Sequence, residues 1–167
     1  MTSDAGGAPP ATSSGWQLPR LRITRDGDWV DDGEVVTHPG IVRHLQENLR
    51  VDAAGHHLQI GPLRVPVEVE DAPYVVLRVE PEGDALMLTL NDFSREPLAV
   101  DTLSFDAHAV PHCRVKAGQF LARLSRAATY QLFEQVDADE DGEQATLRLG
   151  GARHSLPPGA VASDRLA

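Results

Sequence analysis

Alternation of hydrophobic and polar residues in the middle of the chain is its clearest structural signal. Residues 65–69 place valine at every second position, which is the period of a strand with one buried face. Residues 75–79 resume the alternation after an acidic, proline-containing break at residues 70–73, and residues 86–90 repeat it. These runs predict a three-stranded antiparallel meander over residues 65–90.

Shorter elements are predicted before this meander. Two Asp-Gly pairs, at residues 26–27 and 32–33, favour tight hairpin turns because they tolerate positive φ angles. They separate strand-like runs at residues 21–24, 28–30 and 34–36. Pro39 then begins a predicted helix over residues 39–50, since proline is favoured in the first turn of a helix. Its apolar stripe comprises Ile41, Val42, Leu45 and Leu49.

The second half repeats this order of elements. Residues 103–105 and 113–116 are candidate strands, and residues 118–136 are predicted to form a second helix with a broad apolar face. A terminal hairpin is expected at residues 145–149 and 152–156, around Gly150-Gly151.

The predicted fold class is α+β, with mostly antiparallel strands and two helices. We expect one compact unit over residues 18–157, made of two similar strand-helix-hairpin halves at residues 18–80 and 81–157. Residues 58–67 and 147–156 align with Leu, Gly and Arg in register, which suggests a duplication beside the alternative of two unrelated units. The small and polar residues of segments 1–17 and 158–167 predict disordered tails.

Composition limits the function classes. The net charge is −10, from 25 acidic and 15 basic side chains, which argues against nucleic-acid binding and leaves a basic protein partner as an alternative to simple solubility. The single cysteine, Cys113, fits a reducing cytoplasm. No secretory signal and no apolar run long enough for a membrane span are recognised in the sequence.

Several chemistries are considered and set aside. Residues 137–142 imitate the first half of a calcium loop, but Arg148 stands where the closing glutamate belongs. His108 and His112 have a ligand-like spacing, yet Pro111 disfavours the helix that would bring them together. Cys113 has no evident base for nucleophilic chemistry. Neither a Gly-x-Ser-x-Gly elbow nor a glycine-rich phosphate motif occurs. We therefore expect no metal and no cofactor.

A set of short motifs resembles a bacterial family known as domain-of-unknown-function family 1285 (DUF1285). The resemblance covers residues 18–157, and the helix predicted at 118–133 belongs to it. This chain departs from the family in carrying His56-His57 and His112 where aromatic residues are common. The motif residues are Ile23, Asp26-Gly27, Trp29, Gly33, Glu70-Asp71-Ala72-Pro73-Tyr74, Asn91-Asp92, Pro111 and Arg114-Val115.

The resemblance implies a compact α+β structure with an internal repeat and a ligand-binding or signalling role. With no complete catalytic constellation in the sequence, the leading hypothesis is a cytoplasmic, non-enzymatic module that binds an unknown small molecule or protein. The alternatives are an enzyme using the carboxylates near Glu70 and Asp92, and a structural subunit of a complex or homo-oligomer. We expect the site near Glu70, Asp71, Tyr74, Asn91, Asp92, Arg114 and Lys116.

Overall fold

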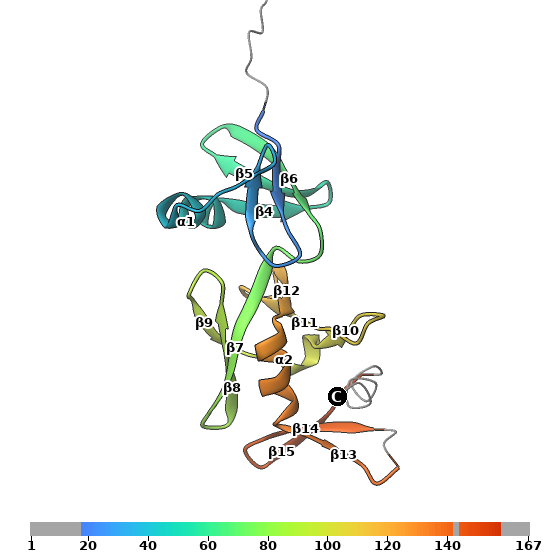
Figure 1. Ribbon diagram of the computed structural model, residues 1–167. Coiled ribbons are helices and arrows are strands. Elements are labelled where there is room, and N and C mark those ends of the chain that lie inside the picture. The colour runs from blue at the N-terminus through green and yellow to red at the C-terminus, as the bar shows by residue number, and fades with distance from the viewer. Residues whose placement is uncertain (1–17, 142–143, 158–167) are drawn as a thin grey trace, which may run out of the picture.

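The computed structural model describes residues 18–141 and 144–157, and these form an elongated stack of sheets (Figure 1). One six-stranded sheet and helix α1 occupy one end, a second six-stranded sheet lies in the middle, and helix α2 with a three-stranded sheet occupies the other end. The order of the layers follows the order of the chain, so the position of a segment in sequence largely gives its position along the stack.

The first sheet has the strand order β3-β2-β1-β6-β5-β4. Its strands β1 and β6 run parallel, and its other neighbours are antiparallel. The elements are β1 (Leu21–Ile23), β2 (Trp29–Asp31), β3 (Glu34–Val35), α1 (Pro39–Glu47), β4 (Leu49–Asp52), β5 (Gly55–Ile60) and β6 (Leu63–Val69). The predicted strands at residues 21–24, 28–30 and 34–36 are confirmed to within a residue or two.

The second sheet has the order β10-β11-β12-β7-β8-β9, again with one parallel pair, β7 and β12. Helix α2 packs against β7, and the last three strands form the small antiparallel sheet. The elements are β7 (Tyr74–Glu82), β8 (Ala85–Leu90), β9 (Arg95–Pro97), a 3-10 turn η1 (Val100–Thr102), β10 (Ser104–Phe105), β11 (Pro111–Val115), β12 (Phe120–Leu124), α2 (Arg126–Phe133), β13 (Val136–Ala138), β14 (Ala145–Leu149) and β15 (Ala152–Ser155).

The α+β class with two helices and mostly antiparallel strands is confirmed, and the two six-stranded sheets are similar enough to be two halves. Each helix is followed along the chain by three antiparallel strands, β4-β5-β6 after α1 and β13-β14-β15 after α2. The chain passes from the first sheet to the second at residues 70–73, which we call the connector.

The predicted central meander is wrong in one respect. Strands β7 and β8 pair as expected, but β6 does not pair with β7. Strand β6 lies between β1 and β5 instead. Alternation reports which face of a strand is buried and not which strand lies beside it, so both arrangements fit the same pattern.

The first helix is shorter than predicted. It ends at Glu47, where the Asn48 side-chain amide donates to the backbone carbonyl of His44 at 2.8 Å. Leu49 continues the apolar stripe in sequence, but it begins β4 and pairs with Leu58. A leucine four residues after Leu45 suits either a helix face or the buried start of a strand, and packing decides between them.

The second predicted helix is partly wrong, because residues 120–124 of the predicted span 118–136 form strand β12. Phe120, Ala122 and Leu124 are buried in alternation, and this strand pairs with both β11 and β7. The helix begins only after Ser125, whose hydroxyl accepts from the backbone amide of Ala128 at 3.1 Å. Such a cap satisfies a helix-start amide that has no partner within the helix.

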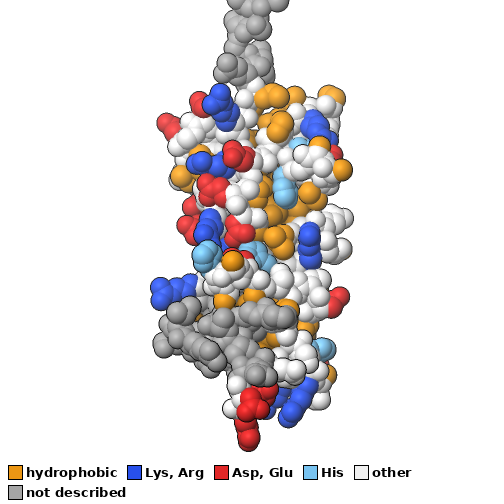
Figure 2. Space-filling view, turned by 90° about the vertical axis from the view of Figure 1, so that its right-hand side faces the viewer, with side chains coloured by type: hydrophobic (Ala, Val, Ile, Leu, Met, Phe, Trp, Pro, Cys, Tyr) orange, Lys and Arg blue, Asp and Glu red, His pale blue; other side chains and the backbone are white. Residues whose placement is uncertain are grey.

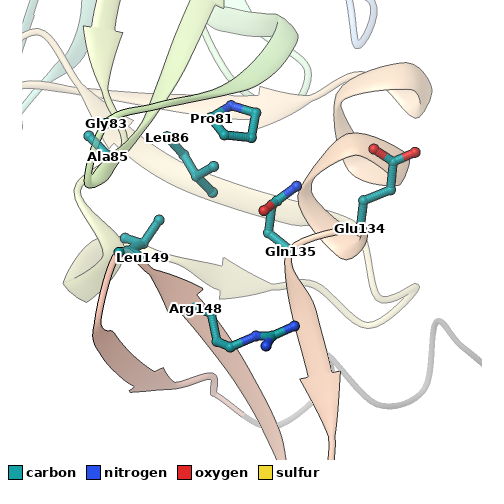
Figure 3. Close-up of a pocket in the computed structure, with 9 residues that line it drawn as sticks. Pro81, Gly83, Ala85, Leu86, Glu134, Gln135, Arg148 and Leu149 are labelled. Carbon is teal, nitrogen blue, oxygen red and sulfur yellow. The ribbon is translucent and has the colours of Figure 1, made fainter.

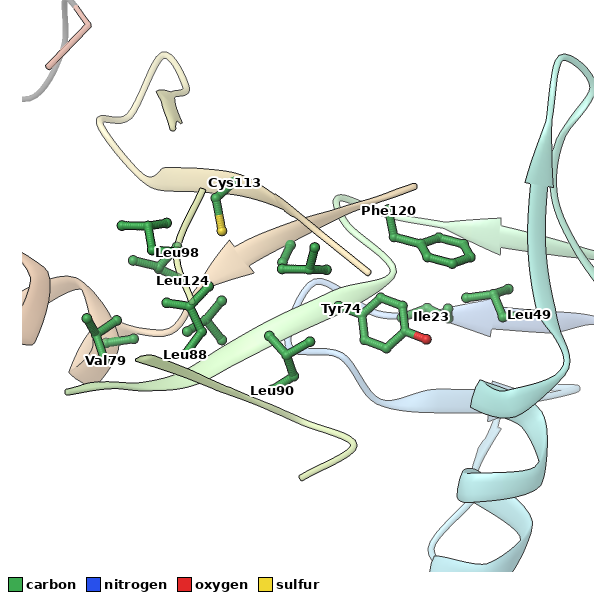
Figure 4. Packing of buried hydrophobic residues seen from close by; sticks show 14 of the residues in the cluster. Ile23, Leu49, Tyr74, Val79, Leu88, Leu90, Leu98, Cys113, Phe120 and Leu124 are labelled. Carbon is green, nitrogen blue, oxygen red and sulfur yellow. The ribbon is translucent and has the colours of Figure 1, made fainter. Parts of the chain in front are cut away.

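One hydrophobic core runs through the junction of the two six-stranded sheets. Ile23 and Leu49 of the first sheet share a cluster with Tyr74 and Phe120 of the second (Figure 4). The Tyr74 and Phe120 rings meet edge to face with centroids 5.4 Å apart. Hydrophobic side chains also gather on part of the surface (Figure 2). Among the described residues, no helix is long and apolar enough to cross a membrane.

Candidate functional site

The seven residues expected at the site fall into three places. Glu70 and Asp71 lie in the connector. Tyr74, Asn91, Asp92 and Lys116 lie around the end of β8 and the start of β7. Arg114 stands apart: it is exposed on β11, and its backbone amide donates to Thr102 Oγ1 at 2.9 Å.

Glu70 ties the connector to the first sheet. Its carboxylate accepts from the backbone amide of Arg25 at 2.9 Å and lies 3.5 Å from Arg22 Nε. Its own amide donates to the carbonyl of Ile23 at 3.0 Å, which extends the pairing of β6 with β1 by one residue. Both the backbone and the side chain of Glu70 therefore hold the end of β6 in place.

Asp71 ties the connector to the second sheet. His112 Nε2 lies 2.9 Å from Asp71 Oδ1, and Arg123 Nε lies 3.4 Å from Asp71 Oδ2. The other ring nitrogen of His112 lies 3.0 Å from the carbonyl of Val110, so both nitrogens face oxygen acceptors. Asp71 is therefore held between His112 of β11 and Arg123 of β12.

Arg123 also reaches across to the first sheet. Its Nη1 donates to the backbone carbonyl of Arg25 at 3.3 Å and lies 3.8 Å from the Asp26 carboxylate in the β1–β2 turn. Sequence reasoning missed both His112 and Arg123 as partners of Asp71. They lie on separate strands 41 and more residues away, and only the pairing of β11, β12 and β7 brings them together.

Asp92 and Lys116 form the centre of the second group. Lys116 Nζ donates to Asp92 Oδ2 and to Ser94 Oγ, each at 2.7 Å. The backbone amide of Lys116 also donates to the Glu96 carboxylate at 2.9 Å. Burial alone would raise the pKa of Asp92, but hydrogen bonds from Lys116 and Ser94 outweigh it and leave the pKa lowered. Asp92 is therefore held as a carboxylate.

Tyr74 lies beneath this ion pair. Lys116 Nζ is 5.4 Å from the centre of the Tyr74 ring, within the range of a cation–π contact. Burial of the phenol, followed by the charge of Asp92, raises the pKa of Tyr74 to about 12, so the hydroxyl stays neutral. Tyr74 is buried, with 4% of its surface exposed, so it supports the ion pair from below.

Asn91 joins the two sheets near the start of β7. Its side-chain oxygen accepts from the Val75 amide at 3.1 Å, and its side-chain nitrogen lies 3.5 Å from the carbonyl of Gly27. A Cβ at Gly27 would lie 2.8 Å from both the Asn91 amide nitrogen and a Val75 methyl group. Only glycine allows the β1–β2 turn to approach the second sheet this closely.

Phe93, in the same loop, escaped the sequence analysis. It is 80% exposed and has a φ of 65°, a left-handed conformation that is uncommon for a residue other than glycine. Its amide donates to the carbonyl of Leu90 at 2.9 Å, and the amide of Leu90 donates to the carbonyl of Ser94 at 2.9 Å. The loop is therefore fixed on both sides of an aromatic ring that faces solvent.

The structure shows the surroundings of the residues that the sequence analysis considered for nucleophilic chemistry and for calcium binding. The Cys113 thiol is buried, and burial raises its pKa to about 12. Asp137 of the calcium-like turn pairs with Arg148 at 2.6 Å, and Gly142 of that turn lies outside the described residues. Across residues 18–141 and 144–157, no three His, Cys, Asp or Glu side chains are grouped so that they could hold a metal ion.

Comparison with known proteins gives a structural relationship. No family model and no curated protein matches the sequence. A crystal structure of a DUF1285 family protein from Silicibacter pomeroyi DSS-3 superposes with a TM-score of 0.68, at 23% identity, over 93% of this chain and 90% of that one. The chain has the DUF1285 fold.

A second structure supports the same relationship. A DUF1285 family protein from Shewanella baltica OS155 matches with a TM-score of 0.61 and 18% identity, over 70% of this chain and 92% of that one. The resemblance drawn from the sequence motifs is thereby confirmed at the level of the fold. Neither description assigns an activity to the DUF1285 proteins, so function has to be argued from the side chains of this chain.

Proposed function

We propose that this DUF1285-fold protein is a non-enzymatic binding module whose partner is a protein, docked around the loop of residues 91–94. The observation that carries the proposal is Phe93, an 80% exposed aromatic ring on a loop fixed in a left-handed conformation. Backbone strain of this kind costs free energy and is concentrated at functional sites. Exposed aromatic anchors in rigid settings are typical binding hot spots.

The expected site residues have a supporting role in this proposal. Lys116 and Asp92 brace one side of the loop, Asn91 fixes its start against β7, and Tyr74 fills the space beneath. A loop that is already ordered loses little conformational entropy on binding, which favours affinity. The backbone at Lys116 is itself left-handed, with a φ of 55°, so the residues that brace Phe93 carry strain as well.

The charge around the loop suggests the chemistry of the partner. Asp92 is neutralised by Lys116, while Glu80 and Glu82 share the nearby Arg95. The Glu96 carboxylate accepts from the backbone amide of Lys116. With a net charge of −10 on the whole chain, a basic partner would be attracted over a distance and a nucleic acid repelled. The proposed partner surface is thus an apolar pocket with a basic rim. The same proposal includes a signalling role and a cytoplasmic location. The cytoplasmic location is favoured by the single cysteine, Cys113, because one cysteine cannot form a disulfide within the chain.

The alternative of an enzyme has less support. Glu70 lies beside Arg22, Asp71 beside Arg123 and Asp92 beside Lys116. None of the three carboxylates is therefore presented as a free general base. A homo-oligomer formed through an edge strand stays a prediction, with β4 and its 39% exposed Val51 as one available edge.

The test compares immobilised wild-type protein with Phe93→Ala and with a matched control, Tyr130→Ala, in capture from lysate of cells that make the protein. Tyr130 is 57% exposed on α2, so the control also removes an exposed ring. We expect a partner retained by the wild type and the control and lost with Phe93→Ala. For a hot-spot residue, the dissociation constant of the purified pair should rise about 30-fold or more. Equal retention by all three proteins would refute the proposal.

A further inference from the structure

The hairpin that ends the first half and the hairpin that ends the second half have the same strand register. Both β5–β6 and β14–β15 close through two-residue turns that begin with a glycine of positive φ, 57° at Gly61 and 56° at Gly150. The equivalent cross-strand pairs are Leu58–Val65 and Ile60–Leu63 in the first hairpin, and Leu147–His154 and Leu149–Ala152 in the second. Strands β6 and β15 are therefore equivalent.

These equivalent strands differ in what lies along their outer edge. Strand β1 pairs in parallel with β6, so the first sheet continues beyond it. Strand β15 is the last strand of the three-stranded sheet, and in residues 18–141 and 144–157 no strand pairs with its outer side. An unpaired edge presents backbone N–H and C=O groups that can pair with a strand from another chain.

The backbone groups of Arg153 and Ser155 form this free edge. The amide of Leu156 donates to the carbonyl of Ala145 in β14 at 2.8 Å, so every second residue of β15, counting back from Leu156, faces β14. Between them, Arg153 and Ser155 face outward, because the backbone groups of successive strand residues point to opposite sides. Both residues are exposed. Pro157 lacks an N–H and ends the edge.

The rest of the second half holds this edge in place. Leu147, which lies opposite His154, is buried in the hydrophobic core. At the turn, a Cβ on Gly150 would collide with the Asp84 side chain, so the β14–β15 hairpin packs closely against the tip of the β7–β8 hairpin. Figure 3 shows Leu149, at the end of β14, below that tip. A strand that is already ordered loses little conformational entropy when a peptide pairs with it.

The solvent-facing side of the sheet carries an unpaired arginine beside the free edge. Arg148 and Arg153 lie opposite one another on β14 and β15. Arg148 extends toward β13 (Figure 3), where its Nε lies 2.6 Å from the Asp137 carboxylate. Within the part of the chain that the structure describes, the Arg153 guanidinium makes no ion pair or hydrogen bond. A strand added to β15 would place a side chain next to Arg153, and an acidic side chain complements it.

The first half shows what kind of segment fits such an edge. In β1, the buried Leu21 and Ile23 flank Arg22, whose Nε lies 3.5 Å from the Glu70 carboxylate, directly after β6. Aliphatic residues that face the core thus alternate with a polar residue whose charge is opposite to that of the neighbouring segment. Because the corresponding charge on β15 is that of Arg153, the alternating polar residue of its occupant would be acidic.

We propose that the outer edge of β15 binds an extended peptide segment of a partner protein, in which aliphatic and acidic residues alternate. The peptide adds to β15 as a further strand, as β1 adds to β6. Its aliphatic side chains lie beside His154 and Leu156, and an acidic side chain faces Arg153. The net charge of −10 repels such a peptide over a distance, so backbone pairing and aliphatic contacts supply the affinity and Arg153 the selectivity. The site is separate from the Phe93 loop.

The test is a titration of the isotope-labelled full chain with three matched peptides, followed by amide chemical shifts. The first has the sequence Ser-Leu-Glu-Ile-Glu-Val-Ser with blocked ends, the second has lysine in place of glutamate, and the third is the first with methylated backbone nitrogens. We expect saturable shifts at Arg153, Ser155 and Leu156 with the first peptide, weaker shifts with the second and none with the third. Equal shifts with all three peptides, or shifts confined to other strands, would overturn the proposal.

Three variants locate the site. Arg153→Gln should weaken binding of the glutamate peptide about two- to fivefold, the size expected for an exposed ion pair, whereas Arg43→Gln, on the exposed side of α1, should leave it unchanged. Ser155→Pro removes an outward N–H and should abolish binding; the equivalent position of β6 is Pro66, so the fold tolerates proline there. Phe93→Ala should bind the peptide as the wild type does, which separates this site from the proposed function. Unchanged binding in both Arg153→Gln and Ser155→Pro would refute the proposal.

Discussion

Asp71 should be one of the most sensitive polar positions in this protein, because its carboxylate holds the connector to His112 and Arg123 of the second sheet. Replacing it with alanine leaves His112 without its carboxylate partner and Arg123 with only the more distant carboxylate of Asp26, at 3.8 Å. His112 and Arg123 have side chains that are only 7% and 20% exposed, so water can replace the lost contacts only in part. The change therefore creates poorly compensated polar groups at the junction.

The expected loss of unfolding free energy in Asp71→Ala follows from how little these side chains are exposed. Hydrogen bonds to charged groups contribute about 1.5–3 kcal/mol, and breaking a fully buried ion pair costs about 3–5 kcal/mol. Asp71 itself is 23% exposed, which places Asp71→Ala at about 3 kcal/mol of lost unfolding free energy. For a chain of this length that corresponds to a fall in Tm of about 6–12 °C.

Urea unfolding followed by circular dichroism measures this directly, with the midpoint moving to lower urea and the slope unchanged. Asp31→Ala is the matched control, since Asp31 is an exposed carboxylate at the end of β2. A double variant with His112→Gln should lose less than the sum of the two single variants, because the residues share one contact. A loss for Asp71→Ala no larger than that of the control would refute the account of the connector.

Two further predictions concern the residues around β7 and β8. Because the folded-state pKa of Asp92 is lowered, its contribution to stability is present above the unfolded pKa near 4 and is lost as the pH falls through the folded value. Asp92→Asn should therefore narrow the difference between urea midpoints measured at pH 7 and pH 3, and an unchanged difference would contradict the assignment. Gly27→Ala should cost more unfolding free energy than Gly33→Ala, since both have a φ of 87° but only Gly27 lies against Val75. At Gly33 the only cost is that of placing alanine in a left-handed backbone conformation, about 1 kcal/mol. Equal losses of unfolding free energy for the two variants in thermal unfolding would argue against the close approach of Gly27 to Val75.

The sequence predicted most of the individual strands and both helix regions, because those depend on local patterns. Asp-Gly turns and alternating valines are properties of a few neighbouring residues, and strands β1, β2, β3, β6, β7 and β8 appear where those patterns stand. Errors occurred where one pattern fits two elements. Leu49 and the segment 120–124 satisfied a helical stripe, yet both lie in strands that the packing of a neighbouring strand stabilises.

The candidate site shows the same division. The sequence placed Asp92 and Lys116 in one candidate site, but they are 24 residues apart, and only the second sheet places their charged atoms 2.7 Å from each other. Asp71 was expected at the site without any stated partner, and the tertiary structure gave it His112 and Arg123. The preference for a strand, turn or helix depends on residues that are adjacent in sequence. Ion pairs and exposed aromatic anchors depend instead on which strands lie side by side, and burial of the whole core determines that arrangement.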